Sequence, residues 1–257
     1  NVSRYDWKTG NNYTIRPTHP NPNIKLRFNW NAGIGQDPFN NNIIYFGSQF
    51  VHKSTDKGLT WNIISPDLTS NDPSKQKQSE SGGLTLDATG AENHCTILVI
   101  EPSSVEKDMI WVGTDDGRVH ITKDGGEIWT DVTKGLKGLP EGSWIPQIKA
   151  SNKNKGEALL IANDYRRFNY EAYAYKTKNY GKTWERIANS GDIPTFTLSI
   201  IEDLLNPNLI FLGSDDGLYF SLNAGDNWQK FDSKTFPTVS TKDLTIAVNA
   251  AITLERP

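Results

Sequence analysis

The chain repeats the stretch Thr122-Lys123-Asp124-Gly125-Gly126-Glu127-Ile128-Trp129 in three other places, with the same residue types at the same spacing. The other copies are Ser54-Thr55-Asp56-Lys57-Gly58-Leu59-Thr60-Trp61, Thr177-Lys178-Asn179-Tyr180-Gly181-Lys182-Thr183-Trp184 and Ser221-Leu222-Asn223-Ala224-Gly225-Asp226-Asn227-Trp228. All four read Ser/Thr-x-Asp/Asn-x-Gly-x-x-Trp, which we call the repeat motif. Internal repetition of this kind indicates an architecture built from repeated structural units.

The residue types of the repeat motif are those of a hairpin turn. The Asp or Asn side chain can bond to nearby backbone N–H groups, and the Gly accepts a positive φ. The Ser or Thr adds a local hydroxyl bond, and the Trp offers a large apolar surface to bury. We therefore interpret these positions as structural and expect each Trp to be largely buried. They are Asp56, Trp61, Asp124, Trp129, Asn179, Trp184, Asn223 and Trp228.

Each copy of the repeat motif lies within a predicted unit of four strands. Around the second copy we expect strands at 94–101, 109–114, 118–123 and 129–132, with a hairpin turn at Asp115-Asp116-Gly117. The fourth copy repeats this order at 196–201, 209–213, 218–222 and 228–231, with a turn at Asp215-Asp216-Gly217. Four-stranded repeats of about 40–45 residues are typical of propeller blades. The predicted fold class is all-β, a β-propeller of four-stranded antiparallel blades, with about four full blades plus parts of others.

The ends of the chain and the longer gaps between motifs define the domain organisation. The gaps locate insertions at 65–93, 133–143 and 163–171. Residues 2–9 and 13–16 resemble the last two strands of a blade, and residues 242–246 resemble the first strand of another. Residues 1–257 are therefore either a single propeller domain, closed as a five-bladed ring, or a segment of a larger propeller.

Composition excludes several functional classes. The chain has 27 Lys+Arg against 30 Asp+Glu and no basic block, which argues against a nucleic-acid partner. Its apolar stretches are only of strand length, so we expect no membrane span. The four histidines have no metal-ligand spacing, and we predict no metal and no cofactor. Cys95 is expected to be a buried thiol. Because neighbours on a strand point to opposite faces, it should not pair with His94.

The chain resembles a known group of propellers. The four copies of the repeat motif resemble the Asp-box, or bacterial neuraminidase repeat, of sialidase-like and sortilin-like propellers. Further stretches are similar to bacterial secreted proteins with sortilin-like (Vps10-type) propellers, among them Arg27-Phe28-Asn29-Trp30-Asn31 and Trp111-Val112-Gly113-Thr114-Asp115-Asp116-Gly117. The similarity covers roughly residues 2–246. It implies an extracellular, cell-surface or periplasmic location and further blades or domains in a longer chain.

The candidate site lies on the propeller face that surrounds the channel mouth. In a propeller, the loops joining strands two and three share this face with the connections between blades, and the repeat motifs lie on the opposite face. We place Asn29, Asp87, Asp115, Asp215 and Asp216 at this mouth, together with two sets of candidate site residues. Glu92, His94 and Asp116 are candidates for proton transfer. Candidates for ligand binding are Arg27, Trp30, Trp144, Asp164, Arg166 and Arg167. Residues 70–84 are expected to form a loop over the same face.

Two functional classes compete on this evidence. The first is a propeller that binds a glycan or a peptide or protein partner. The alternative is a glycoside hydrolase, xyloglucanase-like or sialidase-like, which would need two carboxylates across a sugar-binding cleft, with Trp30 and Trp144 stacking on sugar rings. The sialidase reading ranks last, since only Ile15-Arg16-Pro17 is remotely like its Phe/Tyr-Arg-Ile-Pro motif. Binding leads because no spacing specifies a carboxylate pair, and whether the protein is an enzyme stays open.

Overall fold

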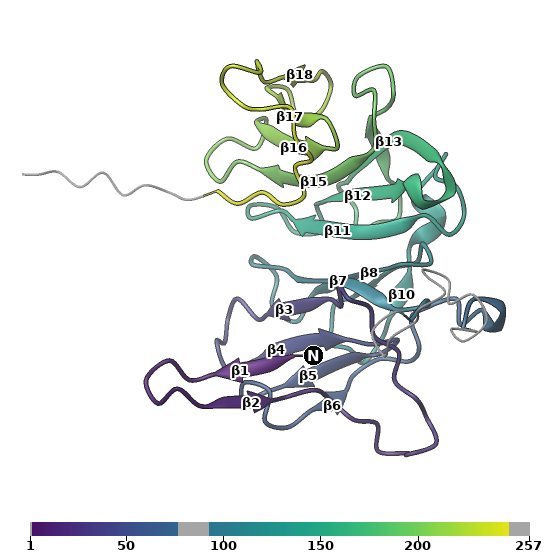
Figure 1. The fold of residues 1–257 in the computed structure, drawn as a ribbon, viewed down its shortest axis with the longest axis vertical. Helices are drawn as coiled ribbons and strands as arrows, with labels where there is room; N and C mark the ends of the chain where they lie inside the picture. Colours follow the sequence, from purple (N-terminus) through teal and green to yellow (C-terminus); the bar gives the residue numbers. More distant parts are fainter. Residues whose placement is uncertain (1, 77–92, 247–257) are drawn as a thin grey trace, which may run out of the picture.

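Four antiparallel sheets of four strands form an arc in the computed structural model, which describes residues 2–76 and 93–246 (Figure 1). Blade 1 contains β3 (Ile34–Gln36), β4 (Ile44–Gly47), β5 (Val51–Ser54) and β6 (Asn62–Ile63), and blade 2 contains β7 (Ile97–Pro102), β8 (Ile110–Thr114), β9 (Val119–Thr122) and β10 (Thr130–Asp131). Blade 3 contains β11 (Trp144–Ala150), β12 (Ala158–Asp164), β13 (Asn169–Thr177) and β14 (Glu185–Ala188), and blade 4 contains β15 (Thr197–Glu202), β16 (Ile210–Ser214), β17 (Gly217–Ser221) and β18 (Gln229–Lys230). The predicted all-β propeller architecture is confirmed.

A two-stranded hairpin precedes blade 1. Its strands are β1 (Ser3–Tyr5) and β2 (Asn12–Thr14), both shorter than predicted. The hairpin and blade 4 lie at opposite ends of the arc (Figure 1). The only helices in the described part of the chain are three single 3-10 turns, one in each predicted insertion. They are η1 (Pro73–Lys75), η2 (Thr133–Gly135) and η3 (Tyr165–Arg167).

The cores lie between neighbouring sheets. The inner strands β3, β7, β11 and β15 follow one another around the arc, and each contacts the next. Between blades 2 and 3, the buried side chains include Trp111, Ile145, Leu160 and Trp184. Comparable clusters lie between blades 1 and 2 and between blades 3 and 4. Each blade is therefore stabilised mainly through its neighbours, as in other repeat architectures.

All four copies of the repeat motif form the same hydrogen-bonded hairpin. In the first, the Ser54 hydroxyl donates to Asp56 Oδ1 at 2.7 Å and accepts from the Gly58 amide at 2.7 Å, while Asp56 Oδ1 accepts from the Thr60 amide at 2.9 Å. The other three copies make the equivalent bonds. The hairpin thus satisfies its own polar groups, as its residue types predict.

The glycine and tryptophan of each repeat motif also contact the preceding sheet. A Cβ atom at Gly126 would lie 2.6 Å from the Ile64 carbonyl oxygen, and Trp129 Nε1 donates to that oxygen at 2.8 Å. Trp61 and Trp228 donate in the same way to Ile15 and Ile187. The repeat motif therefore joins each sheet to the sheet or hairpin before it, and we call this contact the latch.

The expectation that all four tryptophans are largely buried is correct, and Trp184, which is only 6% exposed, is the most deeply buried. Trp61, Trp129 and Trp228 are partly exposed and pack against the buried clusters beside their sheets. Trp184 differs because the second insertion covers it: a Cβ atom at Gly135 of η2 would lie 2.7 Å from Trp184 Cδ1. Its Nε1 finds no hydrogen-bond partner among the described residues.

The repeat motifs and the β8–β9 turn lie on opposite faces, as expected. In blade 2, the Gly125 amide donates to Asp108 in the β7–β8 connection, so both turns share one face, which we call the motif face. The β8–β9 turn at Asp115-Asp116-Gly117 lies at the other strand ends, where the Ser70 amide donates to Asp116 Oδ2 at 2.7 Å. We call this second face the channel-mouth face.

Two predicted strands differ from the structure, since one begins later than expected and the other is not a strand. Strand β7 begins at Ile97 rather than at residue 94, because Cys95 has a φ of +59° that no strand can contain. Residues 242–246 are not a strand, although the Thr241 amide donates to Ser214 where the inner strand of a next blade would start. A strand there would need a partner strand, and none pairs with it among residues 2–76 and 93–246.

Candidate functional site

A cavity of about 240 Å³ opens at the channel-mouth face between blades 2 and 3. It is lined by Lys75, His94, Gly142, Trp144, Asn163, Asp164, Arg166 and Arg167. The structure thus brings together five of the predicted site residues, namely His94, Trp144, Asp164, Arg166 and Arg167. They come from separate strands and loops, and the sequence places them together only through the propeller topology.

The cavity is predominantly cationic. Arg167 pairs through Nε with Asp164 Oδ1 at 2.6 Å and donates through Nη2 to the Glu141 carbonyl at 2.7 Å. Its Nη1 and the Lys75 ammonium flank Gly142, where a Cβ atom would lie 3.8 Å from the first and 3.5 Å from the second. Gly142 has a φ of +76° and no side chain to cover either cation. Two positive groups therefore converge on the partly exposed backbone of Gly142, an arrangement that suits an anion.

Trp144 does not offer the sugar-stacking surface that was predicted for it. Its side chain is only 8% exposed, and the Arg166 guanidinium lies 3.3 Å from the centre of its ring. Arg166 also lies over the Tyr165 ring at 4.4 Å. This cation–π stack holds Arg166 in place at the cavity wall. Trp30, by contrast, is 65% exposed.

His94 and Cys95 contact each other, so the prediction that they cannot pair is wrong. Cys95 Sγ lies 3.5 Å from His94 Nδ1, because the positive φ of Cys95 removes the alternation of a strand. The thiol is nevertheless fully buried, as predicted, and burial raises its pKa to about 11. Burial also lowers the pKa of His94, which favours a neutral imidazole. A neutral thiol beside a neutral imidazole is not an activated nucleophile.

The remaining predicted residues have structural partners or lie outside the described residues. Arg27 pairs with Asp67 at 2.7 Å and donates to the Cys95 carbonyl, so its guanidinium is held by the fold. Asp116 accepts from the Thr114 hydroxyl and the Ser70 amide, which ties its carboxylate to the turn. Glu92, Asp87 and most of the expected loop at 70–84 fall within residues 77–92, outside the described residues.

Sequence reasoning missed Lys75. It stands in an insertion rich in Ser, Lys and Gln, where nothing distinguishes it from its neighbours. Its place is set by Asp72, whose side chain accepts from the Ser74 amide at 2.9 Å and caps η1. Asp72 followed by Pro73 was the available signal, because that pair favours the start of a helical turn.

Asp115 should make stability depend on pH. It is fully buried and accepts from the Thr96 amide at 2.8 Å and the Thr96 hydroxyl at 2.6 Å. Burial outweighs these bonds and raises the pKa of Asp115 to about 7. A raised pKa in the folded state contributes stability at low pH that is lost as pH rises through about 7.

As pH rises from about 5 to 7, the unmodified protein should therefore lose about 2 kcal/mol in its free energy of unfolding. The variant Asp115→Asn should not show this loss, because asparagine does not ionise. Urea unfolding of both proteins across this range measures the difference. Parallel stability curves for the two proteins would contradict the assignment.

No family model and no curated protein matches the chain. Among solved structures, it is similar to an ancestral GH74 enzyme, with 21% identity and a TM-score of 0.56 over 82% of this chain and 26% of that one. The GH74 xyloglucanase from Xanthomonas campestris shows 17% identity and a TM-score of 0.55, over 78% of this chain and 29% of that one. The extracellular domain of a proposed hybrid two-component system from B. thetaiotaomicron shows 13% identity and a TM-score of 0.50, over 81% and 25%.

These similarities establish the fold. The neighbours are β-propeller proteins, and at such low identities the likeness carries the architecture and not the activity. The chain spans between 25% and 29% of the length of each of these three structures. Within the part of the chain that the structure describes, no helix is long and apolar enough to cross a membrane. The same residues contain no group of three or more His, Cys, Asp or Glu side chains placed to hold a metal ion.

Proposed function

We propose that this chain is a segment of a larger propeller that binds an anionic ligand at its channel-mouth face. The ligand class is an acidic glycan or an acidic peptide. The observation that carries the proposal is the convergence of Lys75 and Arg167 on Gly142, beside the Arg166–Trp144 stack. Arginine offers planar, bidentate recognition of carboxylate and sulfate groups, and a rigid cavity wall lowers the entropic cost of binding.

The surrounding charges support an anion over a cation. Lys25 lines a smaller pocket that shares His94 with the main cavity, so a further positive group lies along the rim. Among the described residues that line the main cavity, Asp164 is the one carboxylate, and its Oδ1 is paired with Arg167. A ligand carboxylate or sulfate would therefore meet more positive than negative charge.

The resemblance to Asp-box propellers of the sortilin-like, bacterial secreted type supports the same proposal. The hydrogen bonds of the repeat motif are what such a hairpin requires, and one structural neighbour is an extracellular domain. We infer an extracellular, cell-surface or periplasmic location. The alternative of a glycoside hydrolase is supported by the fold shared with GH74 enzymes. Two of the described channel-mouth carboxylates, Asp115 and Asp116, are however engaged in structural hydrogen bonds.

The double variant Arg166→Ala with Arg167→Ala tests the proposal. Screened on an array of acidic and neutral glycans and peptides, the unmodified protein should bind acidic members, and the variant should bind them at least about tenfold more weakly. Arg167→Lys should fall between the two, because it keeps the charge but loses the planar fork.

The matched control is Lys178→Ala with Lys182→Ala, which removes two exposed positive charges from the motif face. This control should bind like the unmodified protein. Equal weakening in both double variants would mean that net charge, and not this cavity, drives binding. Release of reducing sugar from a bound glycan would favour the hydrolase.

A further inference from the structure

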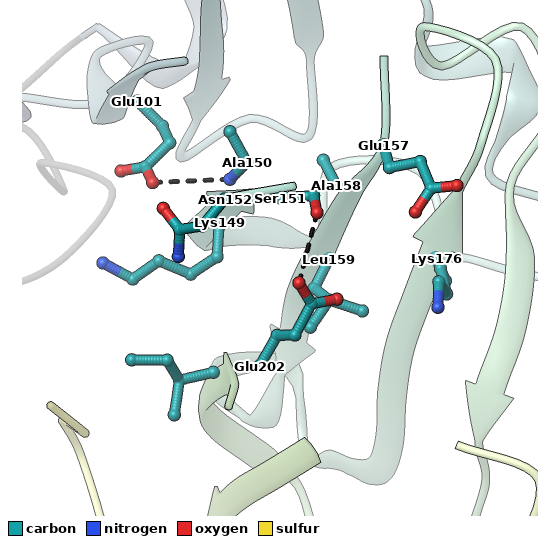
Figure 2. A pocket seen from close by; sticks show the side chains of 11 residues that line it. Glu101, Lys149, Ala150, Ser151, Asn152, Glu157, Ala158, Leu159, Lys176 and Glu202 are labelled. Carbon is teal, nitrogen blue, oxygen red and sulfur yellow. Dashed lines mark hydrogen bonds between the residues drawn. The ribbon is translucent and has the colours of Figure 1, made fainter. Parts of the chain in front are cut away.

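A second pocket lies on the motif face, where the inner strands of blades 2, 3 and 4 end. Its volume is about 190 Å³, and Figure 2 shows the side chains that line it. Glu101 comes from β7, Lys149 from β11 and Glu202 from β15. Glu157 and Lys176 line the side formed by the outer strands of blade 3. Neither the repeat motif nor the channel-mouth cavity accounts for this concentration of charge.

The acidic groups of the pocket are only partly satisfied by the protein. Glu101 Oε1 accepts from the Ala150 amide at 3.4 Å, and Glu202 Oε1 accepts from the Ser151 hydroxyl at 3.1 Å (Figure 2). The second oxygen of each carboxyl group has no hydrogen-bond donor among the described residues. Glu202 is only 8% exposed, and burial raises the pKa of both side chains. Partly buried carboxylates that lack a full set of donors gain from a cationic partner.

The basic groups of the pocket do not supply that partner. Lys149 and Lys176 form no ion pair with Glu101, Glu157 or Glu202 in residues 2–76 and 93–246, although all five side chains line one pocket. In the view of Figure 2, the carboxyl group of Glu202 lies between the two lysines, which extend to opposite sides. The fold therefore holds Lys149 near enough to Glu101, and Lys176 near enough to Glu202, for attraction between them, but too far apart for direct ion pairs.

We propose that this pocket binds a zwitterion of the size of an α-amino acid. The ligand ammonium group would lie against Glu101 and Glu202, and its carboxylate against Lys149 or Lys176. A molecule with both charges satisfies groups that a singly charged one would leave unpaired in a partly buried site. The apolar part of the lining, Leu159 and Ile201, suits a small aliphatic side chain. None of the described residues that line the pocket is aromatic, which disfavours a stacked sugar.

Titration calorimetry with the twenty standard α-amino acids at neutral pH tests the proposal. At least one should bind with a dissociation constant in the millimolar range or tighter. Propylamine, propionate and glucose, which lack one or both charges, should bind at least about tenfold more weakly.

Three variants make the result specific to this pocket. Glu202→Gln and Lys149→Met should each weaken the amino acid at least about tenfold, whereas Lys178→Met, which removes an exposed charge from the same face, should not. If Glu202→Gln does not fold, Lys149→Met and Lys176→Met test the proposal in its place, and each should weaken binding of the amino acid. The proposal is overturned if no amino acid binds, if propylamine or glucose binds as tightly, or if Lys178→Met weakens binding equally.

Discussion

Replacing Trp184 by alanine is expected to lower the free energy of unfolding by about 3–5 kcal/mol. The indole fills the space between blades 2 and 3, where it meets Trp111 edge-on with ring centres 5.7 Å apart. Removing it leaves a cavity that β-strands on both sides cannot close. Because blades are stabilised by their neighbours, the loss should extend to blade 2. Chemical denaturation followed by tryptophan fluorescence and far-UV circular dichroism measures the effect.

Trp184→Phe is the matched control. Since Trp184 Nε1 has no partner among the described residues, phenylalanine removes no hydrogen bond there and should cost only about 1 kcal/mol. Trp129→Phe, in contrast, also removes the bond to the Ile64 carbonyl. An unchanged denaturation midpoint for Trp184→Ala would refute the structural role of the repeat motif in this blade.

Gly126→Val is expected to destabilise the protein by about 3 kcal/mol or more. The residue has a φ of +108°, which a β-branched side chain strongly resists, and its Cβ would lie 2.6 Å from the Ile64 carbonyl oxygen. That oxygen belongs to the backbone of the preceding sheet and cannot rotate away. The variant should therefore push blades 1 and 2 apart as well as strain the turn. Thermal and urea unfolding measure the loss.

The neighbouring glycine provides the control. Gly125 has a φ of +77°, but the nearest atom to its Cβ position is Asp108 Oδ1 at 3.6 Å. The other copies carry Lys57, Tyr180 and Ala224 at this position, all with φ near +60°. Gly125→Asn should therefore cost no more than about 1 kcal/mol, because asparagine tolerates this conformation. If both substitutions cost the same, backbone strain alone would explain the result and the contact between sheets would not matter.

The sequence predicts the repeated hairpins well, because each turn is determined by residues close together in the chain. Ser54, Asp56 and Gly58 satisfy one another locally, and the same residue types recur in every blade. The start of β7 could not be predicted, because no local rule assigns a positive φ to Cys95. The burial of Trp184 was predicted, but its cover by η2 of the preceding insertion was not, because that contact joins distant parts of the chain.

The candidate sites were predictable to different degrees. Arg166 and Arg167 stand out because no turn rule requires them, and topology then brings them to the rim with His94. The stacking of Arg166 on Trp144 is a tertiary contact that their types alone do not specify. Glu101 and Glu202 each stand at the end of an apolar strand, and each resembles an ordinary solvated strand end. Only the arrangement of the inner strands reveals that they share a pocket.

The latch formed by each repeat motif gives the arc a direction. In every case the glycine abuts the sheet or hairpin that precedes it in the chain, and three of the tryptophans donate to the same element. Protein synthesis proceeds from the N-terminus, and N-terminal units generally fold first. Each emerging hairpin would thus meet a docking surface that already exists. The arc can therefore fold blade by blade during synthesis, because the latch of each blade contacts only an element that precedes it in the chain.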